Sequence, residues 1–316
     1  MTFSNKYRLA FIFVIIFILL FTLVFLFLRR PTFMPSSDNL TTYQIRIPGV
    51  QETYQFLYIT DTHIVLPKEK DGQQIFEYAS SRLNTFSQDG VSPSSDQFPG
   101  WVHYANTKGF DGLLLGGDII DSPSASNLSY LQASLEKINI PYIYTLGNHD
   151  WTFPWEYMTE ESSTKYLPLL APYMDNNTSI HSIEYEEFII VSVDNSSNQI
   201  KPDALEEYKT ILAQEKPVIL MLHVPLYTPS ILKKASGIWQ NGVILGGGIH
   251  GGIYPNDVSA QFIALTTAKD SPVEAVLAGH VHFAEKSDII GEKSIPQITG
   301  DAGFKGMGTI IQISGE

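Results

Sequence analysis

Carboxylate, amide and imidazole side chains follow five apolar runs of strand length in this sequence. The segments TDTH, GGDIID and GNHD come after Phe56–Ile59, Gly112–Leu115 and Tyr142–Thr145. A lone histidine follows Val218–Leu222, and AGHVH comes directly after Ala275–Leu277. Ligand sites in α/β sheets form where strands end, so these groups are expected to converge on one place. The converging residues are Asp61, His63, Asp118, Asp121, Asn148, His149, Asp150, His223, His280 and His282.

The types of these side chains indicate a metal site. Imidazole together with carboxylate and amide oxygens suits Mn, Zn, Fe or Ni, whereas Mg and Ca prefer oxygen alone. These residues offer more ligand atoms than one tetrahedral ion needs. Either two ions bind, or some of the residues only orient the ligands. Two divalent ions about 3.5–4 Å apart that share a carboxylate would clamp a phosphoryl group and turn a bridging water into a hydroxide nucleophile.

The elements that must position these residues alternate between strands and helices. A further strand is predicted at Phe188–Val193. Helical spacing of apolar residues occurs within 128–138 and again in DALEEYKTILAQ after Pro202, where Asp203 and Glu206 are spaced as a capping box. This alternation predicts an α/β fold. Two segments rich in Gly, Pro and Ser are expected to be loops, 87–101 and 228–257.

Composition excludes several classes of protein. The net charge of −13 predicts no nucleic-acid-binding surface, although a local cationic site made by metal ions remains compatible with it. The chain has no cysteine, which excludes disulfides, thiolate ligands and a cysteine nucleophile.

The N-terminus predicts a single-pass membrane protein. The run Leu9–Leu28 has 20 residues with Thr22 as its only polar side chain, enough to span roughly 30 Å of lipid bilayer. A cleaved signal peptide is the alternative, but the run is long for one, and Arg29 and Arg30 stand where small residues should mark cleavage. Basic residues flank both ends of the run, and we expect the catalytic domain to lie outside the cytoplasm. The predicted organisation is a short basic N-terminus at 1–8, an anchor at 9–28, a linker at 29–44 and one domain at 45–316.

The ordered motifs Asp-x-His, Gly-Asp-x-x-Asp, Gly-Asn-His-Asp, a lone His and Gly-His-x-His resemble the calcineurin-like metallophosphoesterase superfamily. The resemblance covers Asp61 to His282 and fills every metal-ligand position of the family pattern. It implies a four-layer α/β/β/α sandwich with two mixed sheets between helices. It also implies an enzyme that hydrolyses a phosphomonoester or phosphodiester by means of a metal-bridged hydroxide.

The same resemblance implies a division of the ligands between two divalent ions, with Asp118 as the bridge. Asp61, His63 and His282 would bind one ion. Asn148, His223 and His280 would bind the other.

The remaining motif residues are expected to serve the reaction without binding metal. The resemblance implies that His149 contacts the phosphoryl group or protonates the departing oxygen, and that Asp121 and Asp150 orient imidazoles. Gly147 is expected to permit the sharp exit from its strand. His250, in the Gly-rich segment 245–257, could reach the substrate.

Two other classes stay open at this point. A catalytically silent module of the same fold would lack some of the metal-ligand residues, and none of them is missing here. A mononuclear metal hydrolase acting on amides or esters would leave the second set of ligands without a role. The sequence does not identify the substrate, the metal or the oligomeric state, because the loops at 87–101 and 228–257 carry no recognisable motif.

Overall fold

The computed structural model describes residues 12, 14–16, 33–87, 92–152, 158–241, 243–246, 248 and 252–315. Within these residues, no helix is both long enough and apolar enough to cross a bilayer. Only Ile12 and residues 14–16 of the predicted anchor are described, so the anchor prediction lies largely outside the described residues. His250 lies outside them as well.

The first sheet is mixed and has the strand order β1-β11-β2-β3-β4. Its strands β2, β3 and β4 run parallel to one another, so their carboxyl ends lie at the same edge of the sheet. β1 pairs with β11 along its whole length, which begins the folded domain inside the segment expected to be a linker. The strands are β1 (Leu40–Arg46), β2 (Tyr54–Ile59), β3 (Gly112–Leu115), β4 (Tyr142–Tyr144) and β11 (Gly308–Ser314).

The second sheet is also mixed, in the order β5-β6-β7-β8-β10-β9. Its central strands β6, β7, β8 and β10 are parallel, and the two edge strands are antiparallel to their neighbours. The strands are β5 (Ile180–Glu184), β6 (Ile189–Val193), β7 (Val218–Met221), β8 (Val273–Ala278), β9 (Glu285–Ile290) and β10 (Ser294–Thr299).

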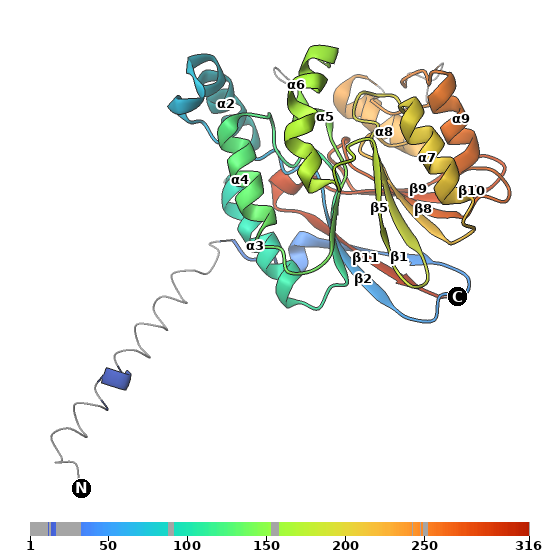
Figure 1. Ribbon diagram of the computed structural model, residues 1–316, viewed down its shortest axis with the longest axis horizontal. Coiled ribbons are helices and arrows are strands. Elements are labelled where there is room, and N and C mark those ends of the chain that lie inside the picture. The colour runs from blue at the N-terminus through green and yellow to red at the C-terminus, as the bar shows by residue number, and fades with distance from the viewer. Residues whose placement is uncertain are drawn as a thin grey trace, which may run out of the picture.

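Helices cover the outer faces of the two sheets. In Figure 1, α2, α3 and α4 lie to the left of the sheets, and α7 and α9 lie to the right. The helices are α2 (Gln73–Phe86), α3 (Ser94–Thr107), α4 (Ala125–Leu135), α5 (Asn148–Trp151), α6 (Glu160–Leu170), α7 (Pro202–Leu212), α8 (Pro229–Trp239) and α9 (Asp257–Thr266). Short 3-10 helices are η1 (Ser37–Asn39), η2 (Glu69–Asp71), η4 (Ala171–Tyr173) and η6 (Gly303–Lys305).

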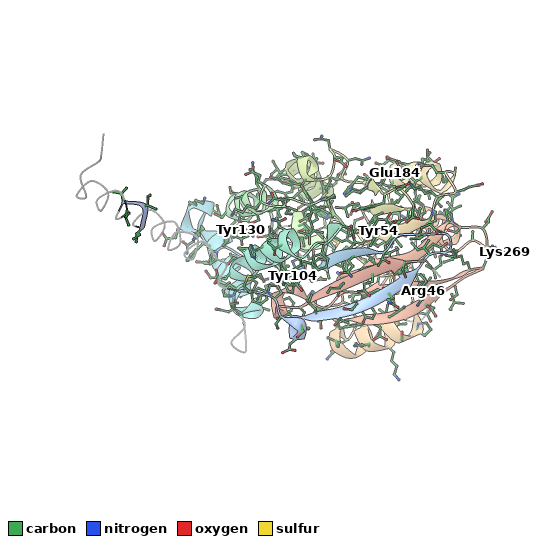
Figure 2. All side chains as sticks on the ribbon, turned by 90° about the horizontal axis from the view of Figure 1, so that it is seen from below. Arg46, Tyr54, Tyr104, Tyr130, Glu184 and Lys269 are labelled. Atoms are coloured by element: carbon green, nitrogen blue, oxygen red, sulfur yellow. The ribbon has the colours of Figure 1, made fainter. Side chains whose placement is uncertain are left out.

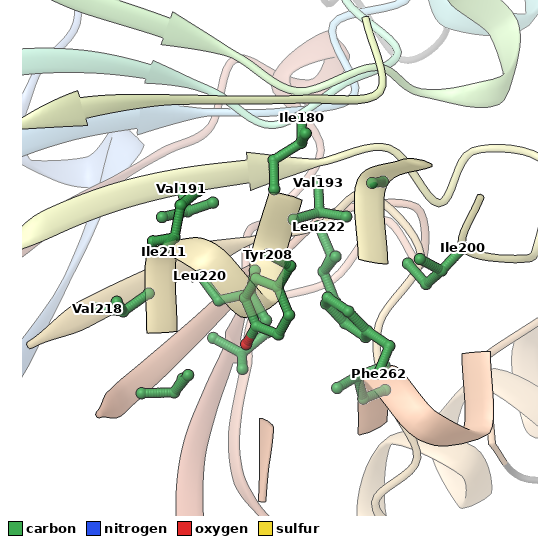
Figure 3. Packing of buried hydrophobic residues seen from close by; sticks show 14 of the residues in the cluster. Ile180, Val191, Val193, Ile200, Tyr208, Ile211, Val218, Leu220, Leu222 and Phe262 are labelled. Atoms are coloured by element: carbon green, nitrogen blue, oxygen red, sulfur yellow. The ribbon is translucent and has the colours of Figure 1, made fainter. Parts of the chain in front are cut away.

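Alternating side chains of the central strands build apolar layers on both faces of each sheet. Val218 and Leu220 of β7 pack with Tyr208 of α7 and Phe262 of α9, as Figure 3 shows. The intervening residues of β7 face the other sheet, where Ile219 belongs to the same buried cluster as residues of β2 and β3. A strand buried on both faces reads as a continuous apolar run, which explains why these strands were easy to locate in the sequence. The described residues therefore form an α/β sandwich.

Polar side chains at the periphery contrast with this filled interior. Figure 2 shows side chains packed between the ribbons, with Lys269 at one end of the domain; Arg46 and Glu184 are also labelled there. All three side chains are exposed. Arg46 is the last residue of β1, Glu184 is the last residue of β5, and Lys269 lies in the turn after α9. The long charged side chains keep their head groups solvated there.

The expectation of a loop through 87–101 is wrong for its second half, because α3 begins at Ser94. Phe98 and Trp101 are buried in the cluster that packs against the first sheet, and this burial outweighs the Pro- and Ser-rich composition. Pro99 lies inside the helix and has no N–H to donate. The carbonyl of Ser95, four residues earlier, instead accepts a hydrogen bond from the Tyr130 hydroxyl at 2.5 Å.

Two local expectations in the second half of the chain also differ from the structure. Helix α7 begins at Pro202 with Lys201 as its N-cap, so Asp203 lies inside the first turn and the predicted capping box is absent. The segment expected to be a loop from 228 contains α8, which Thr228 caps by accepting from the Ile231 N–H at 3.2 Å. Proline at the first helical position favours both helix starts.

Candidate metal centre

The carboxyl ends of five strands meet at one edge of the sandwich and bring the predicted ligands together. Asp61 follows β2, Asp118 follows β3, Asn148 follows β4, His223 follows β7 and His280 follows β8. All are almost fully buried apart from His280, which is partly exposed. They lie in and beneath a cavity of about 450 Å³. Its lining residues are His63, Arg82, Thr85, Phe86, Asp118, Asn148, His149, Trp239, Asn241, Val243, His280, His282 and Phe304.

A first group of possible metal ligands consists of Asp61, His63, Asp118 and His282, whose donor atoms all lie within 4.8 Å of one another. His282 Nε2 lies 3.3 Å from Asp61 Oδ1 and 3.1 Å from His63 Nε2. The imidazole nitrogens thus point at one another and at carboxylate oxygens. Such a convergence of acceptors suits a cation placed between them.

A second group shares Asp118 with the first. It consists of Asp118, His223 and His280, again with donor atoms within 4.8 Å of one another. Asp118 Oδ2 lies 3.1 Å from His223 Nε2 and 3.7 Å from His63 Nε2. One carboxylate oxygen therefore faces a histidine of each group.

The side chain of Asn148 shows whether a metal ion fits among these residues. Its side-chain Oδ1 is buried and has no hydrogen-bond partner among the described residues. A buried acceptor left unsatisfied costs about 1–3 kcal/mol. Coordination of a cation would satisfy this oxygen, and imidazole, carboxylate and amide donors without sulfur are a normal set for a divalent transition metal. The residues fit divalent metal binding.

The backbone is strained where it presents the ligands. Asp61, His63, Asp118, His280 and His282 have φ angles of 52°, 44°, 51°, 70° and 58°, in the left-handed region that side chains other than glycine rarely adopt. Each such residue costs about 1–3 kcal/mol and persists only when its surroundings fix it. Here backbone hydrogen bonds fix the turns, including Asp61 N–H to the Gly117 carbonyl and His63 N–H to the Asp118 carbonyl, both 2.9 Å.

Gly147 is required by close packing and not by an unusual turn, which corrects the expectation from the sequence. Its φ of −100° and ψ of 167° are extended angles that any residue adopts. A Cβ at this position would lie 2.2 Å from both the backbone nitrogen and Oδ1 of Asp118. The glycine therefore lets the β4 turn approach the shared carboxylate.

Asp121 contacts both His63, a member of the first group of possible ligands, and His149, the expected proton donor. Its Oδ1 lies 2.9 Å from His63 Nδ1 and 3.1 Å from His149 Nδ1. Arg82 of α2 donates to both Asp121 oxygens, at 2.7 Å each. Burial alone would raise the pKa of Asp121, but Arg82 and the two histidines outweigh it and hold that pKa far below its ordinary value. The expectation that Asp121 orients imidazoles agrees with these contacts.

Asp150 has a different role from the one expected. Its carboxylate accepts backbone N–H bonds from Gly147 at 2.8 Å, Asp118 at 3.0 Å and Ile120 at 3.1 Å. It therefore fixes the turns that carry the ligands, a role that the sequence did not suggest. The reason is its position in the first turn of α5, where a carboxylate satisfies free amides. Burial and the charge of Asp118 raise the pKa of Asp150 to about 7.

The protonation states of the histidines differ across the centre. Burial lowers the pKa of His63 to about 4 and that of His280 to about 3, so both rings are neutral and able to donate a lone pair. Burial would also lower the pKa of His223, but Asp118 outweighs it and raises this pKa to about 10. A cation that binds at His223 must therefore displace a proton.

The sequence did not point to seven of the residues that line the cavity, and the largest of these side chains are Arg82, Phe86, Trp239 and Phe304. Phe86 stacks on the His63 ring with centroids 4.4 Å apart, and Trp239 and Phe304 lie edge-on to the His282 ring. None belongs to a motif. The single signal was the spacing of Arg82 and Phe86, which lie four residues apart and hence on one helix face.

Comparison with solved structures supports the fold. A search of curated proteins found no match. Among solved structures, a purple acid phosphatase from seeds of yellow lupin (Lupinus luteus) is 16% identical, with a TM-score of 0.50, and the match covers 86% of this chain and 45% of that one. A dimetal phosphatase from Danio rerio is 13% identical, with a TM-score of 0.49, over 80% of this chain and 88% of that one. At these identities the likeness to the lupin structure bears on the fold alone.

The sequence model for calcineurin-like phosphoesterases matches residues 54–284. This match spans most of the chain, from the start of β2 to just beyond His282, and so includes both groups of possible ligands. The resemblance noted in the sequence is confirmed. The chain is a metal-dependent phosphoesterase and belongs to the calcineurin-like phosphoesterase family.

Proposed function

We propose that this protein is a membrane-anchored hydrolase that uses two divalent ions to cleave a phosphomonoester or phosphodiester. The observation that carries the proposal is the position of Asp118, which belongs to both groups of possible ligands. A carboxylate shared in this way is the arrangement expected of a dinuclear centre.

The ligands would divide between the two ions as the family resemblance implies. Asp61, His63 and His282 would hold one ion, Asn148, His223 and His280 would hold the other, and Asp118 would serve both. When bound, the pair of ions supplies Lewis-acid charge and lowers the pKa of a water that serves as the nucleophile.

The protein's own residues position the substrate and move the proton. His149 lines the cavity, and its backbone N–H donates to Asp118 Oδ1 at 2.8 Å, which fixes the residue beside the bridge. Asp121 Oδ1 lies 3.1 Å from Nδ1 of His149 and orients the ring that is to give a proton to the departing oxygen. The side chain of Arg82 donates to both oxygens of Asp121 and restrains it.

Metal content tests this proposal against its two alternatives. Full-length protein purified in detergent should contain about two divalent ions per chain by inductively coupled plasma mass spectrometry, after separate supply of Mn, Zn, Fe and Ni. About one ion would favour a mononuclear hydrolase. None, together with no hydrolysis of any phosphoester, would favour an interaction module with this fold.

The membrane orientation gives a separate test. The linker joins the domain closely, because Phe33 packs on Trp101 with ring centroids 5.5 Å apart and the Asn39 amide donates to the Gly306 carbonyl at 2.8 Å. An anchor at 9–28 would therefore hold the domain near the bilayer surface. Protease added to intact cells should remove a C-terminal epitope tag while a cytosolic marker survives. Protection until the cells are lysed would place the domain inside.

A further inference from the structure

We propose that the cavity binds phosphoesters whose organic group is apolar, and that Trp239 and Phe304 hold that group beside the metal centre. This inference rests on the proposed phosphoester hydrolysis and names the class of substrate. The wall in question is formed by Phe86, Trp239, Val243 and Phe304, all of which line the cavity. We refer to these four residues as the apolar wall.

Trp239 is the exposed end of the apolar wall. It is 41% exposed, and two contacts hold it in place. The indole N–H donates to the Val281 carbonyl at 3.4 Å, and the ring lies edge-on to His282 with centroids 5.0 Å apart. Gln240 follows with a left-handed φ of 54° and ends α8 at this point. An exposed aromatic ring held rigidly at the mouth of a cavity is suited to stacking against a ligand.

Phe304 packs against the same imidazole and is held by backbone hydrogen bonds. Its backbone N–H donates to the Asp61 carbonyl at 3.0 Å, and its own carbonyl accepts from the Gln97 side chain at 3.2 Å. The Phe304 ring lies 5.3 Å from the His282 ring and 4.9 Å from the Phe86 ring. The apolar wall therefore runs from Phe86 through Phe304 and past His282 to Trp239, and it borders the first group of ligands.

The charges of the cavity argue against a polyanionic organic group. Arg82 is the only Lys or Arg among the described lining residues. It donates to both oxygens of Asp121, so it is already committed to a carboxylate. A nucleoside polyphosphate would need further cations for its additional phosphates. The volume of about 450 Å³ is that of an ordinary small-molecule site, and its wall offers carbon surface beyond the phosphate.

An apolar phosphoester could reach this site from two sources. It could be a soluble aryl or alkyl ester, or a phospholipid drawn from the bilayer to which the predicted anchor would tether the domain. Both present the same chemistry to Trp239 and Phe304. The experiment below separates them.

The test compares substrates that share leaving-group chemistry and differ in apolar surface. With full-length, metal-loaded protein, kcat/KM should be at least tenfold higher for hexyl phosphate than for ethyl phosphate. Trp239→Ala and Phe304→Ala should each reduce this ratio roughly three- to tenfold, and Trp239→Phe should restore most of it. Ile238→Ala is the matched control, because Ile238 is 55% exposed on the same helix and is absent from the cavity lining. It should leave the ratio unchanged.

A binding measurement separates this inference from the proposed reaction. Calorimetry should show tighter binding of hexylphosphonate than of ethylphosphonate, with the preference reduced in Trp239→Ala. Preference in binding without hydrolysis would sink the proposed function and keep the apolar site. Hydrolysis with equal kcat/KM for both esters, or ratios that the two alanine variants leave unchanged, would overturn the apolar site alone.

Two further assays, one with a phospholipid in vesicles and one with a soluble ester, distinguish the two sources of the substrate. Hydrolysis of phosphatidic acid in phosphatidylcholine vesicles, faster than that of hexyl phosphate, would support the apolar site with a bilayer source. Hydrolysis of hexyl phosphate without turnover of the vesicles would support it with a soluble source.

Discussion

Asp118→Asn is expected to lower phosphoester hydrolysis by several orders of magnitude while the fold persists. Oδ1 of Asp118 accepts the backbone N–H of His149, and an asparagine oxygen can keep that bond. The amide nitrogen then replaces Oδ2, the oxygen that lies 3.1 Å from His223 and 3.7 Å from His63. A neutral amide that directs N–H groups at two cation sites can no longer bridge them, so both sites should weaken together.

Three measurements decide this prediction: kcat/KM, metal ions per chain and the thermal unfolding midpoint. Asp288→Asn is the matched control, since Asp288 is an exposed carboxylate on β9. It should retain full activity and metal content. An active, metal-replete Asp118→Asn protein would contradict the dinuclear centre, whereas loss of only one ion would show that Asp118 serves a single site.

The metal centre was readable from the sequence because each ligand is encoded next to the strand that positions it. Asp61 and His223 follow apolar runs that are buried on both faces, and such runs stand out without any structure. Parallel strands place their carboxyl ends at one edge, so order along the chain became proximity in space. The left-handed backbone conformation at Asp61 and His280 could not be predicted from the sequence, since neither residue type indicates that conformation.

The surroundings of the centre could not be predicted, because they come from distant segments whose placement depends on packing. Arg82 reaches Asp121 from a helix 39 positions away along the chain, and Trp239 lies on a helix that replaced an expected loop. Asp150 shows the same limit at short range. A carboxylate beside a histidine suggested a partner for an imidazole, whereas the Asp150 carboxylate accepts from the free amides of the turn.

His149→Ala is expected to slow the hydrolysis of alkyl phosphoesters by roughly 10²–10⁴-fold and of aryl phosphoesters distinctly less. When a nucleophile attacks phosphorus, the departing oxygen gains negative charge. An alkoxide is a poor leaving group and needs a proton in the transition state, while p-nitrophenolate needs that help far less. His149 lines the cavity, and its Nδ1 lies 3.1 Å from Asp121, so its imidazole is placed to supply the proton.

The pattern across substrates, and not the size of the loss, identifies the role of His149. His103→Ala is the control, because His103 is an exposed histidine on α3, and it should leave both substrate classes unaffected. Equal slowing of alkyl and aryl esters would instead indicate that the ring stabilises charge on the phosphoryl oxygens. His63, Asp121 and His149 also place donor atoms within 4.8 Å of one another. Loss of a metal ion from His149→Ala would therefore make this ring a ligand. Unchanged metal content together with a selective loss of activity on alkyl esters leaves proton donation as the role that accounts for both results.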